Sequence, residues 1–434
     1  MAVDLLLDLG ASRIKAGLHD DETGSIVAER DVEAPAPHFG AQGEVEIPGE
    51  AYAPLVEELC GDLIRRTGLS VRRMAICSEM HGFALESAGQ PVSYVSWRDE
   101  RAVRSGVFDR LRDELGPVFR SVTGMRLRPG LPFVTLAHMA RHGGLPARSR
   151  LYSLPDWLIS RLGTWNGAID ESLAAGLGLY DLDGRAWSPV LLDKAGAAET
   201  LPDLARPAAM GRSEQGVVTL AGQEIPVMAA CGDLQAAVYG SACPAVTALC
   251  VNVGTGSQVN RVGVRPDNPF VEERPFPNAG RMATISHIPA GRAFRVFENF
   301  FRELGKGEEF WRLAAALDAE QVERAELRVD LNVFAGAWRY RDGGAIAGIR
   351  EGGFTPQSLV AGAVKALATQ YAEAIDLIDP RSDCDRIILA GGMKQRIPAL
   401  AGILERLTGR EAAASPQGEE TLTGLIRLLG EGGA

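Results

Sequence analysis

Two stretches of this sequence, one near its start and one past its middle, share the same order of strand, polar residue and glycine turn. Residues 3–9 form an apolar run closed by Gly10, and residues 14–18 form a second short run. Residues 248–253 are also apolar, and they lead into Gly254. Glycine permits the positive-φ turns that reverse a chain between two strands. The pattern predicts a duplicated architecture in which each half opens with a glycine-turned hairpin.

Strands, glycine turns and helices alternate along the rest of the chain. Leucines spaced along residues 53–66 predict a helix, and residues 74–77 predict a buried strand. Thr355, followed by a proline, predicts the N-cap of a helix over residues 357–378. Residues 170–183, in contrast, have the composition of loops and a strand. This alternation favours α/β domains.

The length of 434 residues exceeds what one ordinary core accommodates, so we expect two domains, residues 1–240 and 241–434. The composition, 46% apolar and 23% charged, is typical of a soluble globular protein, and no apolar run is long enough to span a membrane. Asp4 and Asp8 interrupt the apolar N-terminus, which therefore predicts a strand rather than a signal peptide.

The net charge of −11 argues against nucleic acid as the main partner. The six cysteines are scattered and form no Cys-x-x-Cys pair, which predicts reduced core thiols in a cytoplasmic protein. The six histidines lack the spacing of metal ligands, so we expect no structural zinc.

The glycine turns are the candidates for phosphate binding, because two other nucleotide signatures are absent. The chain has no P-loop, and Val259 stands where a dinucleotide fingerprint would need its third glycine. Glycine turns let several backbone N–H groups approach a phosphate. Asp8 could hold Mg²⁺, and Lys15 could offset phosphate charge, although solvated lysines are common. Each turn taken alone is also compatible with a plain hairpin.

Six segments, in the same order along the chain, resemble motifs of the FGGY carbohydrate kinases, a family of the actin-like ATPase superfamily that includes Hsp70 and hexokinase. The segments resemble the first phosphate motif, two sugar-site motifs, the segment of the catalytic aspartate, the second phosphate motif and the adenosine motif. They are residues 8–16, 78–82, 97–101, 232–236, 253–257 and 390–393.

The resemblance implies an α/β fold of two actin-like (ribonuclease H-like) lobes with a central cleft. Residues 1–240 would form the sugar-binding and first phosphate lobe, and residues 241–434 the nucleotide-binding lobe. It implies ATP and Mg²⁺ as cofactors, with Asp233 as the catalytic base and Asp8 and Asp233 near the metal. The implied sugar-site residues are Glu79, Met80, His81, Trp97, Arg98, Asp99, Arg101 and Gln235. The implied nucleotide-site residues are Gly10, Ala11, Ser12, Lys15, Gly254, Thr255, Gly256, Ser257, Gly391, Gly392 and Met393.

Each of these assignments has a structural alternative. Asp233 lies between an apolar strand and an alanine-rich segment, where it could be a helix N-cap. His81 could be a satisfied structural histidine, and Trp97 a core residue. Asp99 and Arg101 could form a surface ion pair, although i, i+2 spacing in an extended segment directs both side chains to one face, which suits a polar sugar.

Three positions depart from the family pattern. Ala11 replaces the usual threonine and removes one hydroxyl near the phosphates. Glu79 replaces a glutamine, and Arg98 replaces a residue that is often asparagine or glutamine. The amino-acid sequence around Asp233 resembles that of sedoheptulokinases most. The expected substrate is therefore a ketose such as sedoheptulose or a pentulose, or a related polyol.

Two rival functions are compatible with the same residues. A catalytically silent protein that binds sugar or nucleotide is compatible with Ala11 and Glu79. A chaperone of the Hsp70 kind would need a peptide-binding domain, for which we expect no room in the chain. The expected partners are a small sugar and ATP, without nucleic acid or membrane, and a homodimer is an option for assembly.

Overall fold

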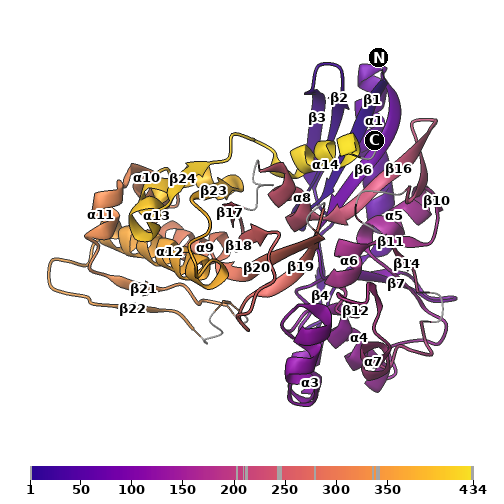
Figure 1. The fold of residues 1–434 in the computed structure, drawn as a ribbon, viewed down its shortest axis with the longest axis horizontal. Helices are drawn as coiled ribbons and strands as arrows, with labels where there is room; N and C mark the ends of the chain where they lie inside the picture. The colour runs from indigo at the N-terminus through magenta and orange to yellow at the C-terminus, as the bar shows by residue number, and fades with distance from the viewer. Residues whose placement is uncertain are drawn as a thin grey trace. The chain divides into compact units, whose positions relative to one another are not determined.

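A computed structural model describes residues 2–201, 204–208, 210, 214–241, 247–277, 280–334, 337–338 and 343–431. The chain divides into two compact units (Figure 1). Unit 1 comprises Met1–Gly240, Arg274–Gly280 and Thr421–Ala434, and unit 2 comprises Ser241–Glu273 and Arg281–Glu420. A single boundary at residue 240 therefore does not describe the division, because two later segments return to unit 1.

Unit 1 contains a seven-stranded sheet and a five-stranded sheet. In spatial order the larger sheet consists of β10 (Gly163–Trp165), β15 (Gly216–Leu220), β16 (Gln223–Gly232), β6 (Ser70–Ser78), β1 (Ala2–Leu9), β2 (Arg13–Asp20) and β3 (Ser25–Glu33). The smaller consists of β4 (His38–Phe39), β5 (Val45–Pro48), β8 (Ser93–Val95), β7 (Phe83–Glu86) and β9 (Arg150–Tyr152). Two short pairs are β11 (Ala168–Asp170) with β14 (Arg206–Ala208), and β12 (Tyr180–Asp181) with β13 (Ala186–Trp187).

The helices of unit 1 surround these sheets. They are η1 (Gly49–Ala51), α1 (Tyr52–Thr67), α2 (Arg101–Arg104), α3 (Val107–Thr123), α4 (Pro132–Arg141), α5 (Leu154–Leu162), α6 (Glu171–Gly176), α7 (Pro189–Lys194), α8 (Asp233–Gly240) and α14 (Glu420–Glu431), whose first residue belongs to unit 2. Helix α6 corrects our expectation of only loop and strand over residues 170–183.

The two faces of strand β1 have different neighbours. Val3, Leu5, Leu7 and Leu9 belong to a buried core that also contains residues of α1 and α5. Side chains alternate along a strand, so Asp8 lies on the opposite face. Strand β1 pairs with β2 antiparallel and with β6 parallel, and β6 pairs with β16 parallel. The carboxyl ends of β1, β6 and β16 therefore meet at one edge of the sheet.

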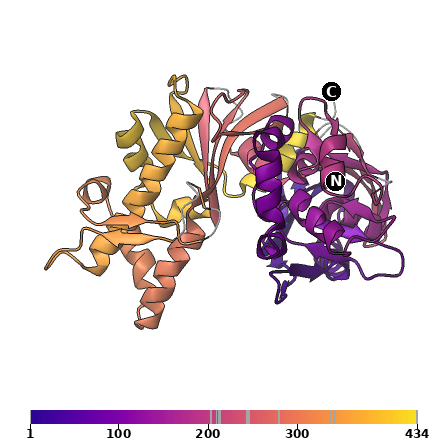
Figure 2. The ribbon, with the colours of Figure 1, turned by 90° about the horizontal axis from the view of Figure 1, so that it is seen from below.

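The C-terminal helix α14 lies beside the first strands (Figures 1 and 2). Its Thr421 contacts Asp8, so the helix covers the face of β1 that carries this residue. Leu422 contacts the position of Gly17 in β2. Gly424 lies so close to α8 that a Cβ there would come within 2.0 Å of the carbonyl oxygen of Ala236. Only glycine permits this approach, and helix α14 thus becomes part of unit 1.

Unit 2 is built on a six-stranded sheet covered by helices. Its strands, in spatial order, are β19 (Glu272–Phe276), β20 (Gly280–Pro289), β18 (Gly256–Val262), β17 (Ala248–Val253), β23 (Arg386–Ala390) and β24 (Glu411–Ala414), with a separate pair of β21 (Arg328–Asp330) and β22 (Ala345–Ala347). Residues 274–276 of β19 and Gly280 of β20 are counted with unit 1. Its helices are α9 (Gly291–Glu303), α10 (Glu309–Ala316), α11 (Ala319–Glu323), α12 (Pro356–Ile378), η2 (Gly392–Arg396) and α13 (Leu400–Thr408).

Several local predictions are confirmed. Residues 248–253 form β17, and helices α1 and α12 lie where the sequence placed them. Thr355 caps α12 by accepting a hydrogen bond from the backbone N–H of Ser358 (3.1 Å). Five of the six cysteines are buried, and Cys243 lies outside the described residues. Within the described part of the chain, the helices are too short or too polar to cross a membrane.

Candidate functional site

The first glycine turn joins β1 to β2 in unit 1. Gly10, Ala11 and Ser12 form this bend, and Ser12 is exposed. The carbonyl oxygen of Ser12 accepts a hydrogen bond from the backbone N–H of Ala34 (3.0 Å), which ties the turn to the end of β3. The predicted hairpin is confirmed, and its geometry alone does not distinguish a phosphate site from a plain turn.

Asp8 stands beside this turn on the face covered by α14. It is partly buried and lies opposite Lys15 on β2 and Cys77 on β6. The Thr421 hydroxyl donates a hydrogen bond to its Oδ2 (2.8 Å), across 413 positions of sequence. Thr421 was not among the predicted residues, because sequence pattern carries no signal for so distant a contact.

Asp233 lies where β16 ends and α8 begins, at the edge of the sheet that also carries Asp8. Its Oδ1 accepts a hydrogen bond from the backbone N–H of Leu234 (2.7 Å). Burial raises the pKa of Asp233 to about 8, with further contributions from the negative charges of Asp8 and Glu79. Among the described residues, no arginine or lysine forms an ion pair with Asp233. The structure therefore couples three acidic groups, and one of them is poised to exchange a proton near neutral pH.

Gln235 and Met80 lie beside the strand end that precedes Asp233. Both side chains approach Gly232 so closely that a Cβ there would lie 2.6 Å from the Gln235 Oε1 and from the Met80 sulfur. Gln235 is fully buried, and its Nε2 donates to the carbonyl oxygen of Pro275 (3.2 Å). Its Oε1 has no hydrogen-bond partner in the described part of the protein. This oxygen is available to accept a hydrogen bond.

Glu79 is a buried carboxylate that follows β6. It accepts hydrogen bonds from the Tyr94 hydroxyl (3.0 Å) and the Trp97 indole N–H (2.9 Å). Burial raises the pKa of Glu79, and these two donors, with the charge of Arg98, oppose the shift. A Cβ at position 82 would overlap the Tyr94 hydroxyl at 2.0 Å, so Gly82 is required for this contact. Glu79 and Trp97 are thus joined by a hydrogen bond, and Tyr94 is a second partner of Glu79 that was not predicted from the sequence.

Both ring nitrogens of His81 have partners. Nδ1 lies 2.8 Å from the carbonyl oxygen of Gly176, and Nε2 lies 2.9 Å from the Arg128 guanidinium. A carbonyl only accepts and a guanidinium only donates, so His81 is neutral with its proton on Nδ1. The backbone of His81 has φ of +67°. This geometry agrees with the structural alternative, and a direct hydroxyl contact from the ring would require Arg128 to move.

Asp99 and Arg101 form a buried ion pair. The Arg101 Nε lies 2.9 Å from each carboxylate oxygen of Asp99, and Arg101 also pairs with Glu46. Asp99 accepts a further hydrogen bond from the backbone N–H of Val45 (2.9 Å). These bonds hold the segment to β5, so the structure favours the ion-pair alternative over direct sugar contact. Arg98 is partly buried and lies near the Ser96 hydroxyl (3.4 Å).

The second glycine turn joins β17 to β18 in unit 2. The carbonyl oxygens of Gly254 and Thr255 accept hydrogen bonds from the backbone N–H groups of Gly291 (3.1 Å) and Arg292 (2.8 Å) at the start of α9. The Ser257 hydroxyl is buried and accepts a hydrogen bond from Tyr371 (2.7 Å), whereas the Thr255 side chain is exposed and Gly256 is half-buried. A helix N-terminus thus lies directly beside the turn.

The Gly391–Gly392–Met393 segment follows β23. The backbone N–H of Gly391 donates to Glu420 (3.3 Å), and Lys394 forms an ion pair with the same carboxylate. A Cβ on Gly291 would lie 2.7 Å from the Met393 sulfur, so this segment adjoins the start of α9. A nearby cavity of about 390 Å³ is bounded by α9, α10 and η2 and is lined by Glu298, Gly307, Glu308, Trp311, Ala315 and Arg396.

The structure thus brings the predicted residues together in two groups. In unit 1, Asp8, Glu79 and Asp233 interact electrostatically at one sheet edge. In unit 2, the second glycine turn and Met393 adjoin the start of α9. No cluster of three or more metal-ligating side chains occurs within the described ranges. A Mg²⁺ ion needs fewer, because it is usually held by one or two carboxylates together with phosphates.

Comparison with known proteins gives relatives over the whole chain. Residues 3–240 match the N-terminal domain of the FGGY family of carbohydrate kinases. A glycerol kinase of Brucella ovis is 29% identical over 50% of this chain, and the chain spans about half (46%) of that protein's length. A glycerol kinase of Xanthobacter autotrophicus is 26% identical over 98% of this chain and 89% of its own length. These relatives are glycerol kinases, so they lend no support to the narrower resemblance to sedoheptulokinases.

Solved structures share the fold. The ligand-bound xylulose kinase of Lactobacillus acidophilus superposes with a TM-score of 0.84 at 16% identity, over 100% of this chain and 89% of that one. The glycerol kinase of Plasmodium falciparum with ADP gives a TM-score of 0.81 at 16% identity, over 100% and 90%. The α/β, actin-like fold class predicted from the sequence is therefore confirmed. Because the family match covers more than half of the chain, the protein belongs to the FGGY family of carbohydrate kinases.

Proposed function

We propose that this protein transfers the γ-phosphoryl group of ATP to a hydroxyl of a small sugar or polyol, with Asp233 as the general base. One observation carries the proposal: Asp233 lies at a sheet edge with its pKa raised to about 8, within the segment that matches the family. A base with a pKa near the working pH accepts a proton efficiently. An N-cap role alone would not place a second carboxylate, Asp8, beside it.

In this proposal Asp233 accepts the proton of the attacking hydroxyl as the phosphoryl group arrives. General-base help of this kind contributes about 10²–10⁴ to the rate, and the rest comes from alignment and charge neutralisation. Lys15, across the hairpin from Asp8, would offset phosphate charge together with the backbone N–H groups of the glycine turns.

Asp8 and Asp233 are the residues that would hold Mg²⁺. Their carboxylates are the hard oxygen donors that Mg²⁺ prefers, and their mutual repulsion, seen in the raised pKa of Asp233, would be relieved by a cation between them. The ion would neutralise charge on the transferred phosphoryl group. Thr421 would keep Asp8 oriented for this role through its hydroxyl.

Unit 2 is the proposed nucleotide site. The glycine turn at 254–257 is the candidate phosphate-binding element of this unit. The first N–H groups of α9 donate to its carbonyl oxygens and thereby hold the turn in place. The cavity lined by Trp311 and Arg396 lies at η2, the helix that follows Gly391, and it offers a planar aromatic surface of the kind that a nucleobase can stack on. The relative from Plasmodium falciparum, a glycerol kinase solved with ADP, supports this assignment.

The proposed sugar site uses Glu79, Trp97 and the buried Oε1 of Gln235. These groups offer hydrogen-bond acceptors and an aromatic wall, which suits a polyhydroxylated substrate. Candidate substrates are sedoheptulose, a pentulose and related polyols, and the relatives named above add glycerol and xylulose. Replacement of the family's glutamine by Glu79 favours substrates that donate hydroxyl hydrogens at this point.

A coupled ADP-release screen over ketoses, alditols and sugar acids tests the proposal. We expect at least one compound to raise ADP release well above the basal rate in the presence of Mg²⁺ and ATP. If no compound does so, while calorimetry detects binding of nucleotide and sugar, the catalytically silent binding function replaces the kinase.

A further inference from the structure

The short helix α6 connects two segments of the candidate site in unit 1. It begins at Asp170, whose side chain caps the helix by accepting from the backbone N–H of Ser172 (2.9 Å). The same Oδ1 also accepts a hydrogen bond from the Ser172 hydroxyl. Both residues are fully buried. The start of α6 is therefore a buried polar arrangement that uses one oxygen of Asp170, whereas its Oδ2 has no hydrogen-bond partner among the described residues.

Ser172 reaches the strand end that carries Asp233. The backbone N–H of Gly232 donates to the Ser172 Oγ at 2.9 Å, and Gly232 is the residue directly before Asp233. An N–H group only donates, so Ser172 must accept from Gly232, and its own proton goes to Asp170. The carboxylate of Asp170 thereby fixes the direction in which the hydroxyl points.

The other end of α6 holds the loop of His81. The carbonyl oxygen of Gly176, the last residue of the helix, accepts the Nδ1 proton of His81 at 2.8 Å. A Cβ on Gly176 would also meet the Met80 methyl group at 3.4 Å. One rigid six-residue helix thus contacts both the strand end before Asp233 and the loop after Glu79.

From this arrangement we infer that Ser172 is a positioning residue, which holds Gly232 and thereby places the Asp233 carboxylate for proton transfer, with Asp170 orienting the serine hydroxyl. The inference rests on the proposed role of Asp233. Ser172 itself would not contact the substrate.

Removal of the serine oxygen would disturb Asp233 through the backbone. The Gly232 N–H would be left buried without an acceptor, a state that proteins avoid by local rearrangement or by admitting water. Either response would displace or hydrate Asp233. The groups whose charge or polarity acts on Asp233 and its neighbours are Asp8 on β1, Glu79 after β6, Tyr94 on β8, Asp170 before α6, and the thiols of Cys77 and Cys231. A displaced carboxylate would no longer be aligned with the attacking hydroxyl, so proton transfer should slow.

The test compares Ser172→Ala with Ser172→Thr and with Ser188→Ala in the full chain. Ser188 is a matched control, because it is buried and caps α7 through the backbone N–H of Leu191 (3.4 Å). With a substrate found in the screen, Ser172→Ala should lower kcat by about 10²-fold with little change in KM, as expected for a displaced catalytic group. Ser172→Thr keeps the hydroxyl and should restore kcat.

The inference is overturned if Ser172→Ala keeps the wild-type kcat, or if it loses activity only in proportion to unfolded protein, as Ser188→Ala would. If Ser172→Ala does not fold, Asp170→Ser is tested in its place. It keeps a capping hydroxyl but loses the carboxylate that orients Ser172, so we expect a smaller loss of kcat with little change in KM, and an unchanged kcat would count against the inference.

A second measurement separates this inference from the proposed function. If the wild type shows no sugar-stimulated ADP release, the kinase proposal fails, and amide hydrogen exchange at Gly232 is measured by NMR instead. Faster exchange at Gly232 in Ser172→Ala than in the wild type, Ser188→Ala and Ser172→Thr supports the hold of Ser172 on this strand end. Equal exchange in all four proteins refutes it.

Discussion

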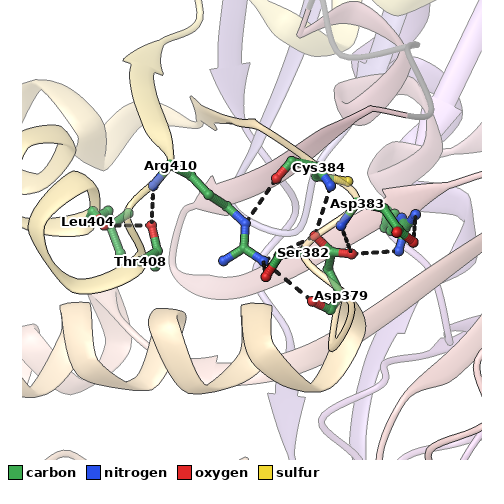
Figure 3. A network of polar contacts seen from close by, with 8 residues as sticks. Asp379, Ser382, Asp383, Cys384, Leu404, Thr408 and Arg410 are labelled. Carbon is green, nitrogen blue, oxygen red and sulfur yellow. Dashed lines mark hydrogen bonds and ion pairs between the residues drawn. The ribbon is translucent and has the colours of Figure 1, made fainter.

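Two aspartates, the partly buried Asp233 in unit 1 and the fully buried Asp379 in unit 2, lie at the ends of secondary-structure elements but in opposite chemical surroundings. Asp379 follows α12 and is 1% exposed. It forms ion pairs with Arg261 (2.7 Å) and Arg410 (3.1 Å), and it accepts two hydrogen bonds from backbone N–H groups of the loop before β23 (Figure 3). Asp233 has no such cation among the described residues, and its charged neighbours are acidic.

The contrast separates a structural carboxylate from a reactive one. Two arginines compensate the charge of Asp379, so this residue joins β18, α12 and the segment before β24. No positively charged side chain compensates the desolvation of Asp233. Its pKa is therefore raised, and its charged form destabilises the folded protein. Natural proteins tolerate such a cost where function needs it. We therefore expect the two residues to respond to substitution with opposite signs.

The largest effect on stability is expected from Asp379→Ala. Removing the carboxylate leaves Arg261 and Arg410 as buried charges without it, which costs about 3–5 kcal/mol of unfolding free energy. Urea denaturation measures this loss. Asp383→Ala is the control, because its carboxylate is half exposed and pairs with Arg261 at the surface, which is worth about 0.2–1 kcal/mol. Equal urea midpoints for the two variants would mean that the buried ion pairs of Asp379 do not stabilise the protein more than the surface pair of Asp383.

Asp233→Asn should stabilise the protein. In the unfolded chain the Asp233 carboxyl ionises near pH 3.8, whereas in the folded protein it ionises near pH 8. Between these values unfolding releases a proton, so the wild type loses stability as pH rises, and the penalty is complete above about pH 8. The Tm advantage of Asp233→Asn should grow from pH 4 to pH 8, to a few degrees, and then level off. An advantage that does not change with pH would contradict the raised pKa.

A smaller effect is expected from Asp8→Asn on the pKa of Asp233. Loss of the Asp8 charge removes repulsion, so the pKa of Asp233 should fall by about one unit. An NMR titration of Asp233 measures the shift. Asp4→Asn provides a control on the same strand and face, because Arg72 and Arg73 already pair with Asp4. If both variants shift Asp233 equally, Asp8 is not its specific neighbour.

Local sequence signals predicted much of the fold. The glycine turns, the Thr355 cap, the helix at 53–66 and the strand at 248–253 depend on neighbouring residues, and the structure has them. Such features are decided by short-range sterics and hydrogen bonding.

Features that depend on distant segments were not predictable. The return of α14 to unit 1 rests on contacts such as Thr421 with Asp8, for which no periodicity in the sequence gives a signal. Helix α6 was missed because it is only six residues long and its cap, Asp170, occurs in a segment rich in turn residues. For the candidate site, the residue types were predicted from resemblance, but the partners Tyr94 and Arg128 became visible only in the structure.

The role of Asp233 is tested most directly by single-turnover phosphoryl transfer with Asp233→Asn, measured with saturating ATP, Mg²⁺ and a substrate found in the screen. We expect the transfer rate to fall by about 10²–10⁴-fold, while the Kd values for nucleotide and sugar stay within a few-fold of the wild type. A transfer rate within tenfold of the wild type would refute the role of Asp233 as the base, and the residue would then be an N-cap.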